Sequence, residues 1–202
     1  MFSGIVQKKC SIISIEDASH LRRFIIDLED LAHDLRIGAS VSVSGVCLTV
    51  IAVENTRVSF EVIQETLSKT TLGGLKKGDR VNIERSIKVG DEIGGHVLSG
   101  HIMGTGMIST IETSLNTYIV TITCQTAEWM EYILSKGFIA IDGCSLTVVD
   151  IGRDWFTIHL IPETLRVTTF SEKKIGDKVN IEIDAQTQVI VETIKRYIQK
   201  PL

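Results

Sequence analysis

The stretch SGVCLTV at residues 44–50 recurs 98 residues later as DGCSLTV at residues 142–148. Three further pairs repeat in the same order: SG at 3–4 with SG at 99–100, IQETL at 63–67 with IPETL at 161–165, and GDRVNIE at 78–84 with GDKVNIE at 176–182. So many matches in one order indicate a tandem duplication whose joint lies near Val97. We therefore expect two copies of one fold, at residues 1–97 and 98–186.

Each copy has the pattern of short β-strands. In residues 40–44 polar and apolar residues alternate, which is typical of a strand with one buried face. Residues 58–62, 119–123 and 155–160 are rich in β-branched and aromatic side chains. A Gly-Asp turn precedes the VNIE stretch of each copy. With about six short strands per copy, the pattern predicts an all-β fold of two small closed barrels, which leave no strand edge exposed.

Three segments depart from the β pattern. We expect short helices at residues 29–36 and 127–136, the second of them ended by Gly137. A third helix is expected from about Thr187, in the tail 187–202, and it has no counterpart in the first copy. Its apolar stripe either folds back on its own barrel or packs against neighbouring chains, and it consists of Ile190, Val191, Ile194, Tyr197 and Ile198.

Composition limits the classes of function. The 202 residues are 44% hydrophobic, and the net charge is −4 with a pI of about 5.7. Clustered Lys and Arg are lacking, which argues against a nucleic-acid or anionic-membrane partner. The first ten residues lack the apolar region of a signal peptide, and the uncharged stretch 38–53 is too short and too polar to span a bilayer. We expect a soluble, cytoplasmic protein.

The cysteines and histidines give no support for a metal site. Cys10, Cys47, Cys124 and Cys144 show no C-x-x-C spacing, and the five histidines include no H-E-x-x-H pair. Scattered cysteines in a cytosolic chain are more often reduced and buried than bridged.

Taken together and in order, the repeated motifs resemble those of the riboflavin synthase family. They are MFSGIV at 1–6, GVCLTV at 45–50 with GCSLTV at 143–148, ETL at 65–67 and 163–165, and GGHVLSGH at 94–101. Each motif is weak alone, but the doubled set is specific, and the resemblance extends from Met1 to about Tyr197.

The resemblance implies a fold and an activity. Each half would be a six-stranded Greek-key barrel that holds one molecule of 6,7-dimethyl-8-ribityllumazine, and the C-terminal helices would join three chains into a homotrimer. Each active site would hold two lumazines, between the N-terminal barrel of one chain and the C-terminal barrel of the next. A four-carbon unit would pass between them without a cofactor or metal. The doubled architecture suits a reaction that consumes two identical molecules.

The resemblance also implies which segments line the two lumazine pockets. We expect three pairs of segments and three single residues: Gly4, Ile5 and Val6 with Gly100, His101 and Ile102; Cys47, Leu48 and Thr49 with Ser145, Leu146 and Thr147; Glu61, Val62, Ile63, Gln64, Glu65 and Thr66 with His159, Leu160, Ile161, Pro162, Glu163 and Thr164; and Phe2, Ser40 and Lys136. Backbone groups there would pair with the pyrimidinedione edge, while Glu and Thr side chains would hold ribityl hydroxyls.

The catalytic candidates stand where the two copies differ. Cys47 replaces Ser145; as a thiolate it would activate water or add at C7 of the acceptor, and otherwise it is a structural strand residue. His101 replaces Ile5 and is either an acid or base or a hydrogen-bonding pocket residue. Ser145 and Thr147 either polarise one lumazine and relay its proton, or are ordinary strand residues.

Other residues keep two interpretations. His96 is assigned to the interdomain turn, and Lys136 either reaches the ligand or lies in solvent. The carboxylates of Glu65 and Glu163 either bind polar ligand groups or face water. Phe2 either packs over a ligand ring or plugs a barrel end. A second set, Asn82, Glu84, Asn180 and Glu182, is assigned to barrel structure.

Two other classes of protein remain as alternatives. One is a non-catalytic lumazine-binding antenna protein, in which the second half loses its ligand motifs; here Ser145, Thr147 and Glu163 stand in register, which favours the enzyme. The other is a structural β-barrel adaptor, which leaves the difference between Cys47 and Ser145 unexplained. We also expect residues 1–97 to fold alone and bind ligand, since their own copy of each pocket segment lies within them.

Overall fold

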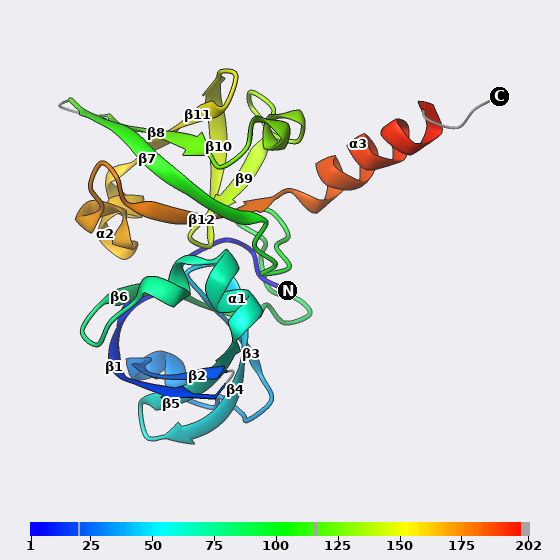
Figure 1. Ribbon diagram of the computed structural model, residues 1–202. Coiled ribbons are helices and arrows are strands. Elements are labelled where there is room, and N and C mark those ends of the chain that lie inside the picture. Colours follow the sequence, from blue (N-terminus) through cyan, green and yellow to red (C-terminus); the bar gives the residue numbers. More distant parts are fainter. Residues whose placement is uncertain (20, 115–116, 199–202) are drawn as a thin grey trace.

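The computed structural model describes residues 1–19, 21–114 and 117–198, which form two β-barrels and a C-terminal helix (Figure 1). The N-terminus lies between the two barrels, and the C-terminal helix projects away from the second barrel. The predicted all-β duplication is confirmed.

The first barrel is closed by six antiparallel strands within the described residues. Their order is β1-β2-β5-β4-β3-β6, and β6 pairs back onto β1. The strands are β1 (Lys8–Ala18), β2 (Leu21–Asp27), β3 (Ser40–Val43), β4 (Val46–Glu54), β5 (Arg57–Ile63) and β6 (Arg80–Arg85). The β3–β4 hairpin turns at Ser44 and Gly45 with φ of 45° and 86°, the left-handed conformation that a two-residue hairpin requires.

The second barrel repeats this topology strand for strand. Its order around the described strands is β7-β8-β11-β10-β9-β12, and β12 closes the barrel by pairing with β7. The strands are β7 (Gly104–Thr113), β8 (Tyr118–Cys124), β9 (Phe138–Ile141), β10 (Cys144–Ile151), β11 (Trp155–Leu160) and β12 (Lys178–Ile183). Its β9–β10 hairpin turns at Asp142 and Gly143 with φ of 46° and 80°.

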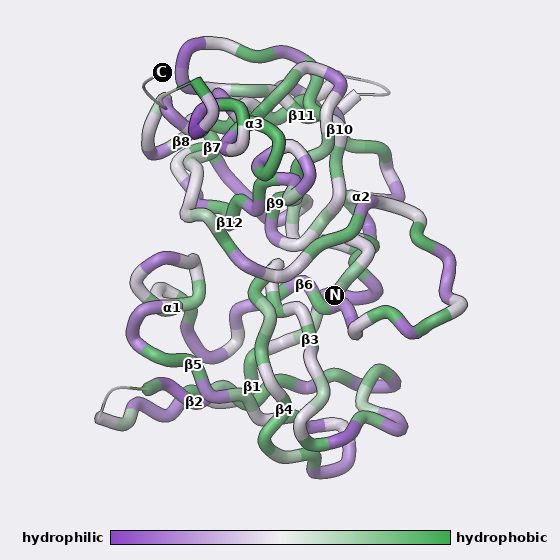
Figure 2. Tube along the Cα trace, turned by 90° about the vertical axis from the view of Figure 1, so that its right-hand side faces the viewer, coloured by the Kyte–Doolittle hydropathy of each residue, from purple (hydrophilic) through white to green (hydrophobic). Residues whose placement is uncertain are grey.

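Each barrel encloses its own hydrophobic core. Phe24 and Phe60 face each other across β2 and β5 and are almost fully buried, as is Phe156 in the second barrel. The alternation of buried and less buried residues along β5 explains this, because successive strand side chains point to opposite faces. Hydrophobic positions run along the strands of both barrels (Figure 2). Replacing one such phenylalanine by alanine costs about 3–5 kcal/mol, so each core is a major source of stability.

The two helical insertions are shorter than the sequence predicts. They are single 3-10 turns, η1 (Glu29–Ala32) and η3 (Ala127–Glu131). Asp34, with φ of 55°, interrupts the first segment, and an α-helix cannot continue through that conformation. The second turn already ends at Glu131, five residues before Lys136, whose φ is 65°. Gly137 therefore ends a turn instead of a helix, and its N–H donates to the carbonyl of Leu134 at 2.9 Å.

A pair of short helices closes one end of each barrel. In the first barrel they are α1 (Gln64–Lys69) and η2 (Thr71–Gly74), and in the second α2 (Pro162–Val167) and η4 (Thr169–Glu172). Thr70 joins the first pair: its hydroxyl donates to the carbonyl of Thr66 and accepts from the N–H of Leu72. Thr168 does the same in the second pair. The sequence pattern does not predict these helices, because it assigns the repeated Glu-Thr-Leu segments only to ligand binding.

The third predicted helix is present as α3 (Ala185–Ile198). Asp184 caps it by accepting from the N–H and the hydroxyl of Thr187 at 2.8 and 2.7 Å, which starts the helix two residues before the predicted position. Ile190, Ile194 and Tyr197 are 59%, 53% and 80% exposed, so the apolar stripe does not fold back on its own barrel (Figure 1). Among the described residues, no helix has the length and apolar character needed to cross a membrane.

Two buried asparagines join the barrels in a reciprocal arrangement. The amide of Asn82 donates to the carbonyl of Asp142 and accepts from the N–H of Thr169, at 2.9 and 2.8 Å. Asn180 donates to Ser44 and accepts from Thr71 in the same way, at 2.8 and 2.7 Å. Four satisfied hydrogen bonds at buried positions fix one orientation of the two barrels.

Candidate active site

The two copies exchange their N-terminal arms, defined here as residues 3–6 and 99–102. The carbonyl of Gly100 accepts from the N–H of Cys47 at 2.9 Å, so the arm of the second copy lies on the first barrel. The carbonyl of Gly4 accepts from the N–H of Ser145 at 2.8 Å, so the arm of the first copy lies on the second barrel. Each arm therefore contacts the motif strand of the other copy, whereas the sequence analysis pairs it with the strand of its own copy; which segments share a lumazine stays a prediction.

A small apolar seam between the barrels causes this exchange. Phe2 and Leu98 form an antiparallel bridge with two hydrogen bonds of 2.9 Å, and both side chains are buried with Ala140, next to Cys47. From this seam the two arms diverge onto opposite barrels. Val6 is then part of the core of the second barrel, and Ile102 packs against the core of the first. Phe2 thus belongs to the seam, where it is 1% exposed, and it does not cap a barrel end.

Glycine is required where each arm touches the other barrel. A Cβ on Gly4 would lie 2.5 Å from the Cβ of Ser145, and a Cβ on Gly100 would lie 2.5 Å from the Cβ of Cys47. Both glycines also have positive φ, 75° and 81°, which other residues adopt only at a cost. The repeated Ser-Gly pair of the sequence is explained by these two contacts.

The first barrel carries a pocket of about 300 Å³ beside the exchanged arm. Cys47 on β4, Thr66 on α1 and His101 on the arm all border it, so residues of both copies meet there. The rest of the wall consists of Val46, Glu65, Lys69, Thr70, Gly100 and Ile102. Two of the four catalytic candidates, Cys47 and His101, are thus placed at one pocket.

The corresponding position in the second barrel is occupied by a histidine that the sequence analysis missed. His96 was assigned to the interdomain turn, but its side chain is buried and its Nδ1 lies 2.7 Å from the hydroxyl of Ser145. Its ring stacks on Phe138, with 5.0 Å between ring centroids. Burial lowers the pKa of His96, although nearby Asp184 opposes the shift, so the neutral ring is favoured.

His96 had no signal in the repeat pattern, because the equivalent position of the first copy would precede Met1. Its Nε2 atom is buried and lacks a hydrogen-bond partner among the residues that the structure describes. A polar atom of this kind next to Ser145 is a candidate contact for a ligand.

Two of the three predicted ligand-binding glutamates pair with a cation on their own helix. Glu65 pairs with Lys69 at 2.8 Å, and Glu163 forms two hydrogen bonds with Arg166, at 2.8 and 2.6 Å. Hydrogen bonding to these cations lowers the pKa of both carboxylates. They are therefore ionised acceptors held at the starts of α1 and α2.

The other predicted residues fall into a buried group and a surface group. Leu48, Val62 and Leu160 are core residues, whose side chains point into the barrels. On the surface, Ser40 stands opposite Thr49, and Phe138 stands opposite Thr147. The remaining candidates lie on exposed or half-buried positions near the strand ends: Ile5, Glu61, Ile63, Gln64, Lys136, Leu146, His159, Ile161, Pro162 and Thr164. Glu61 is paired with Arg23 at 2.7 Å, which ties it to β2.

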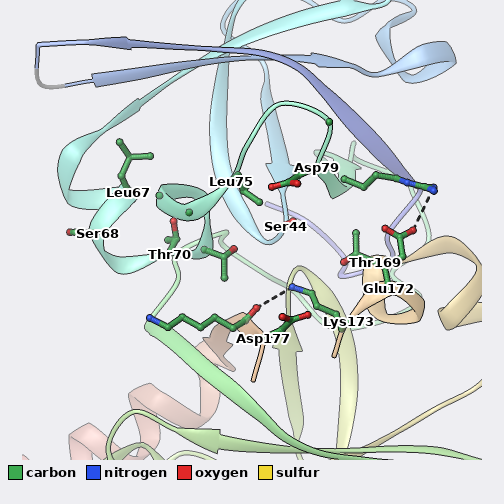
Figure 3. A pocket seen from close by; sticks show the side chains of 16 residues that line it. Ser44, Leu67, Ser68, Thr70, Leu75, Asp79, Thr169, Glu172, Lys173 and Asp177 are labelled. Carbon is green, nitrogen blue, oxygen red and sulfur yellow. Dashed lines mark hydrogen bonds and ion pairs between the residues drawn. The ribbon is translucent and has the colours of Figure 1, made fainter. Parts of the chain in front are cut away.

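A second cavity lies away from the predicted site. It measures about 750 Å³ and lies between η2 of the first barrel and η4 of the second (Figure 3). Lys173 forms an ion pair of 3.0 Å with buried Asp142, and Arg80 lies 3.5 Å from Glu172. Residues of both barrels line this cavity, and the Arg80–Glu172 pair joins them, so we assign it to the interface between the barrels.

Comparison with known proteins identifies the class of protein that these barrels define. Residues 3–86 and 99–184 each match the lumazine binding domain family. The chain is therefore a member of the family of doubled lumazine-binding barrels.

The curated relatives identify the particular family. Riboflavin synthase of Escherichia coli (strain K12) is 49% identical over 199 residues, which cover 98% of this chain and 93% of the relative. Riboflavin synthase of Bacillus subtilis (strain 168) is 39% identical and covers 91% of this chain and 85% of the relative. The chain belongs to the riboflavin synthase family, whose members are enzymes.

Solved structures share the architecture as well. LumP complexed with riboflavin superposes with a TM-score of 0.83 at 29% identity, covering 91% of this chain and all of LumP. LumP complexed with 6,7-dimethyl-8-(1'-D-ribityl) lumazine gives 0.82 at 28% identity, with the same coverage of this chain and 99% of LumP. The doubled barrel of this relative thus accommodates a lumazine-type ring with a ribityl chain.

Proposed function

We propose that this chain converts two molecules of 6,7-dimethyl-8-ribityllumazine into riboflavin and 5-amino-6-(D-ribitylamino)uracil. A four-carbon unit leaves one lumazine and joins the other, so no second substrate or oxidant is consumed. The observation that carries the proposal is the pair of matched barrels with unlike reactive side chains, Cys47 and His101 in one and Ser145 and His96 in the other. Two identical substrates need similar binding sites, and their opposite roles need different chemistry.

The first-barrel pocket supplies the more nucleophilic group. We assign to Cys47 the attack at C7 of one lumazine, either directly or through a water that it activates. His101 borders the same pocket and exchanges a proton with the bound ring. Backbone groups of the segment 61–66 pair with the pyrimidinedione edge, while Glu65 and Thr66 hold ribityl hydroxyls.

The second-barrel site supplies a proton acceptor. Neutral His96 accepts the proton of the Ser145 hydroxyl, which in turn polarises or deprotonates the second lumazine at its 7-methyl group. Burial supports this role, because it lowers the pKa of His96 and keeps the ring neutral. Thr147 assists, and Lys136 and the segment 159–164 hold the ring and the ribityl chain of this molecule. The conjugated lumazine delocalises the resulting carbanion, so no cofactor is required.

We further propose that the active enzyme is a homotrimer. The exposed stripe of α3 is an apolar surface that its own barrel leaves uncovered. Association through α3 would bring the first barrel of one chain to the second barrel of the next, so that the two lumazines meet between chains. Positioning two reactants in this way is worth up to about 7–11 kcal/mol of the barrier.

Incubation of the purified chain with the lumazine alone tests the proposal. We expect riboflavin and the aminouracil in equal amounts, without added metal, nucleotide or flavin. Loss of activity after treatment with a chelator would contradict the cofactor-free mechanism. The second candidate function is binding without turnover, which the likeness to LumP favours. Tight binding of the lumazine with no product would establish that alternative.

A further inference from the structure

The buried carboxylate of Glu182 holds the exchanged arm that borders the first-barrel pocket. Glu182 lies on β12 of the second barrel, on the face opposite to the core residues Ile181 and Ile183, and is 3% exposed. Its Oε1 accepts from the N–H and the hydroxyl of Ser99, both at 2.7 Å, and its Oε2 accepts from the N–H of Gly100 at 3.1 Å. Three hydrogen bonds to this one carboxylate fix the orientation of two successive peptide groups.

This arrangement extends directly to the proposed catalytic groups. The carbonyl of Gly100 accepts from the N–H of Cys47, so a shift of Gly100 moves the strand residue that carries the thiol. The N–H of His101 donates to the hydroxyl of Ser99 at 3.1 Å, which connects His101 to the same carboxylate. The contact between Gly100 and Cys47 leaves no room for a Cβ, so the arm can approach Cys47 this closely only because residue 100 is glycine.

From this geometry we propose that Glu182 is a positioning residue, which sets the places of Cys47 and His101 from a strand of the second barrel. The proposal rests on the function proposed for the first-barrel pocket. The backbone N–H groups of Ser99 and Gly100 can only donate, so both carboxyl oxygens of Glu182 act as acceptors. Glutamine would turn an amide NH₂ toward one of these donors, and aspartate is one methylene too short to reach them.

The chain contains a matched control. Glu84 holds the other arm in the same way: Oε1 accepts from the N–H and hydroxyl of Ser3 at 2.7 Å, and Oε2 accepts from the N–H of Gly4 at 3.1 Å. Gly4 then bonds to Ser145 instead of Cys47. Glu84→Gln therefore makes an equivalent change in the barrel framework, but it acts on the second-barrel site.

The thiol of Cys47 provides a readout that does not depend on turnover. Burial raises the pKa of Cys10 and Cys144 to about 12 and that of Cys124 to about 11, so these three thiols react slowly. Cys47 is half-exposed at its pocket. Its rate of alkylation by iodoacetamide, followed by mass spectrometry of the peptide, reports its exposure and environment in the substrate-free protein.

We expect Glu182→Gln to change the Cys47 alkylation rate by at least about threefold and to lower kcat by about 10- to 100-fold, with a smaller change in KM. Glu84→Gln should lower kcat as well, but should leave Cys47 alkylation within about 1.5-fold of the unmodified protein. Equal effects of the two variants on alkylation, or no effect of either, would overturn the proposal. An unmodified chain that makes no riboflavin would refute the proposed function instead and would leave the alkylation result standing.

A milder variant keeps the test open if Glu182→Gln does not fold. Ser99→Ala removes one of the three donors to Glu182 and the acceptor for the N–H of His101. It should change Cys47 alkylation in the same direction as Glu182→Gln but by a smaller factor, about twofold. An alkylation rate equal to that of the unmodified protein would again overturn the proposal.

Discussion

The two barrels share one topology but differ in the residues at their pockets. Asn82 and Asn180, and Glu84 and Glu182, make equivalent hydrogen bonds in the two copies. At the pockets, by contrast, Cys47 replaces Ser145, Ser40 replaces Phe138, and Ile5 replaces His101. The linker adds His96 to the second barrel only. Residues that repeat thus hold the fold, and the proposed chemistry lies where the copies differ.

The exchanged arms make the two barrels dependent on each other. His101 borders the Cys47 pocket although it belongs to the second copy, and Gly4 contacts Ser145 although it belongs to the first. Two barrels that only followed each other along the chain would not require this exchange of arms. The comparison therefore separates what we expect one barrel to do alone, which is to fold, from what needs both, which is to complete each pocket.

Separating the halves is expected to have the largest effect. A fragment of residues 1–97 should fold, since it contains β1 to β6, but turnover should fall by about 10³-fold or more because Ser145 and His101 are absent. Its pocket also lacks the arm 99–102. We therefore expect ligand binding only at concentrations where two fragments pair and each offers its Gly4 arm to the Cys47 of the other.

A product assay, fluorescence titration with riboflavin and light scattering of the same fragment check these expectations. Near-normal turnover would show that the second barrel has no chemistry of its own. Full-strength binding by a monomeric fragment would show that the arm contributes little to the pocket.

The second-largest effect is expected from removing the Cys47 thiol, which distinguishes the first pocket. Cys47→Ala should lower kcat by about 10²-fold and weaken ligand binding much less, if the thiol acts in the transition state. Cys10→Ala is the control: it removes a thiol that is 1% exposed in the core of the first barrel, and it should cost about 1 kcal/mol of stability with kcat unchanged. Equal kcat losses in the two variants would mean that Cys47 matters only for packing.

The sequence was sufficient to predict the fold because the repeat fixed its architecture. Identical spacing of the Gly-turn and VNIE segments required two copies, and period-two alternation marked strands such as β3 and β5. The helices in the short insertions were predicted too long, because the sequence pattern does not reveal a left-handed residue such as Asp34. Backbone conformation at single positions depends on tertiary contacts that a propensity argument does not contain.

Only part of the candidate site was predictable. Differences between the copies pointed to Cys47 and His101, and both border one pocket. The exchange of arms was not predictable, because it depends on the seam of Phe2 and Leu98, which are far apart in the chain. His96 was missed for a similar reason: its partner Ser145 is 49 residues away, and the repeat offers no equivalent position for comparison.

The helix that belongs only to the second copy gives the next test. Deleting residues 187–202 should yield a folded species of lower mass, with kcat reduced about tenfold or more if the two lumazines meet between chains. The barrels should survive because the described part of α3 contributes no buried side chain. Light scattering and the product assay check this, and a truncated chain that remains trimeric would contradict the role given to α3.

The smallest effect concerns the pH dependence that the His96 contact gives the second barrel. Burial lowers the folded-state pKa of His96 below its ordinary value of about 6.5, so the folded protein binds fewer protons at this site than the unfolded chain does. This contribution to stability is present above about pH 6.5 and is lost as the pH falls through the unfolded value toward the folded one. His96→Gln cannot titrate, so the variant should lose less stability between pH 7.5 and 5.5 than the unmodified protein, by at most about 1.4 kcal/mol, because the unfolded histidine titrates only about one pH unit above the lower value. The buried carboxylates of Glu84 and Glu182 have raised pKa values and act in the opposite sense, but they are common to both proteins and cancel in the difference. Denaturant unfolding of the two proteins at both pH values measures this difference in stability loss. Equal losses of stability in the two proteins would show that His96 is not held neutral against Ser145.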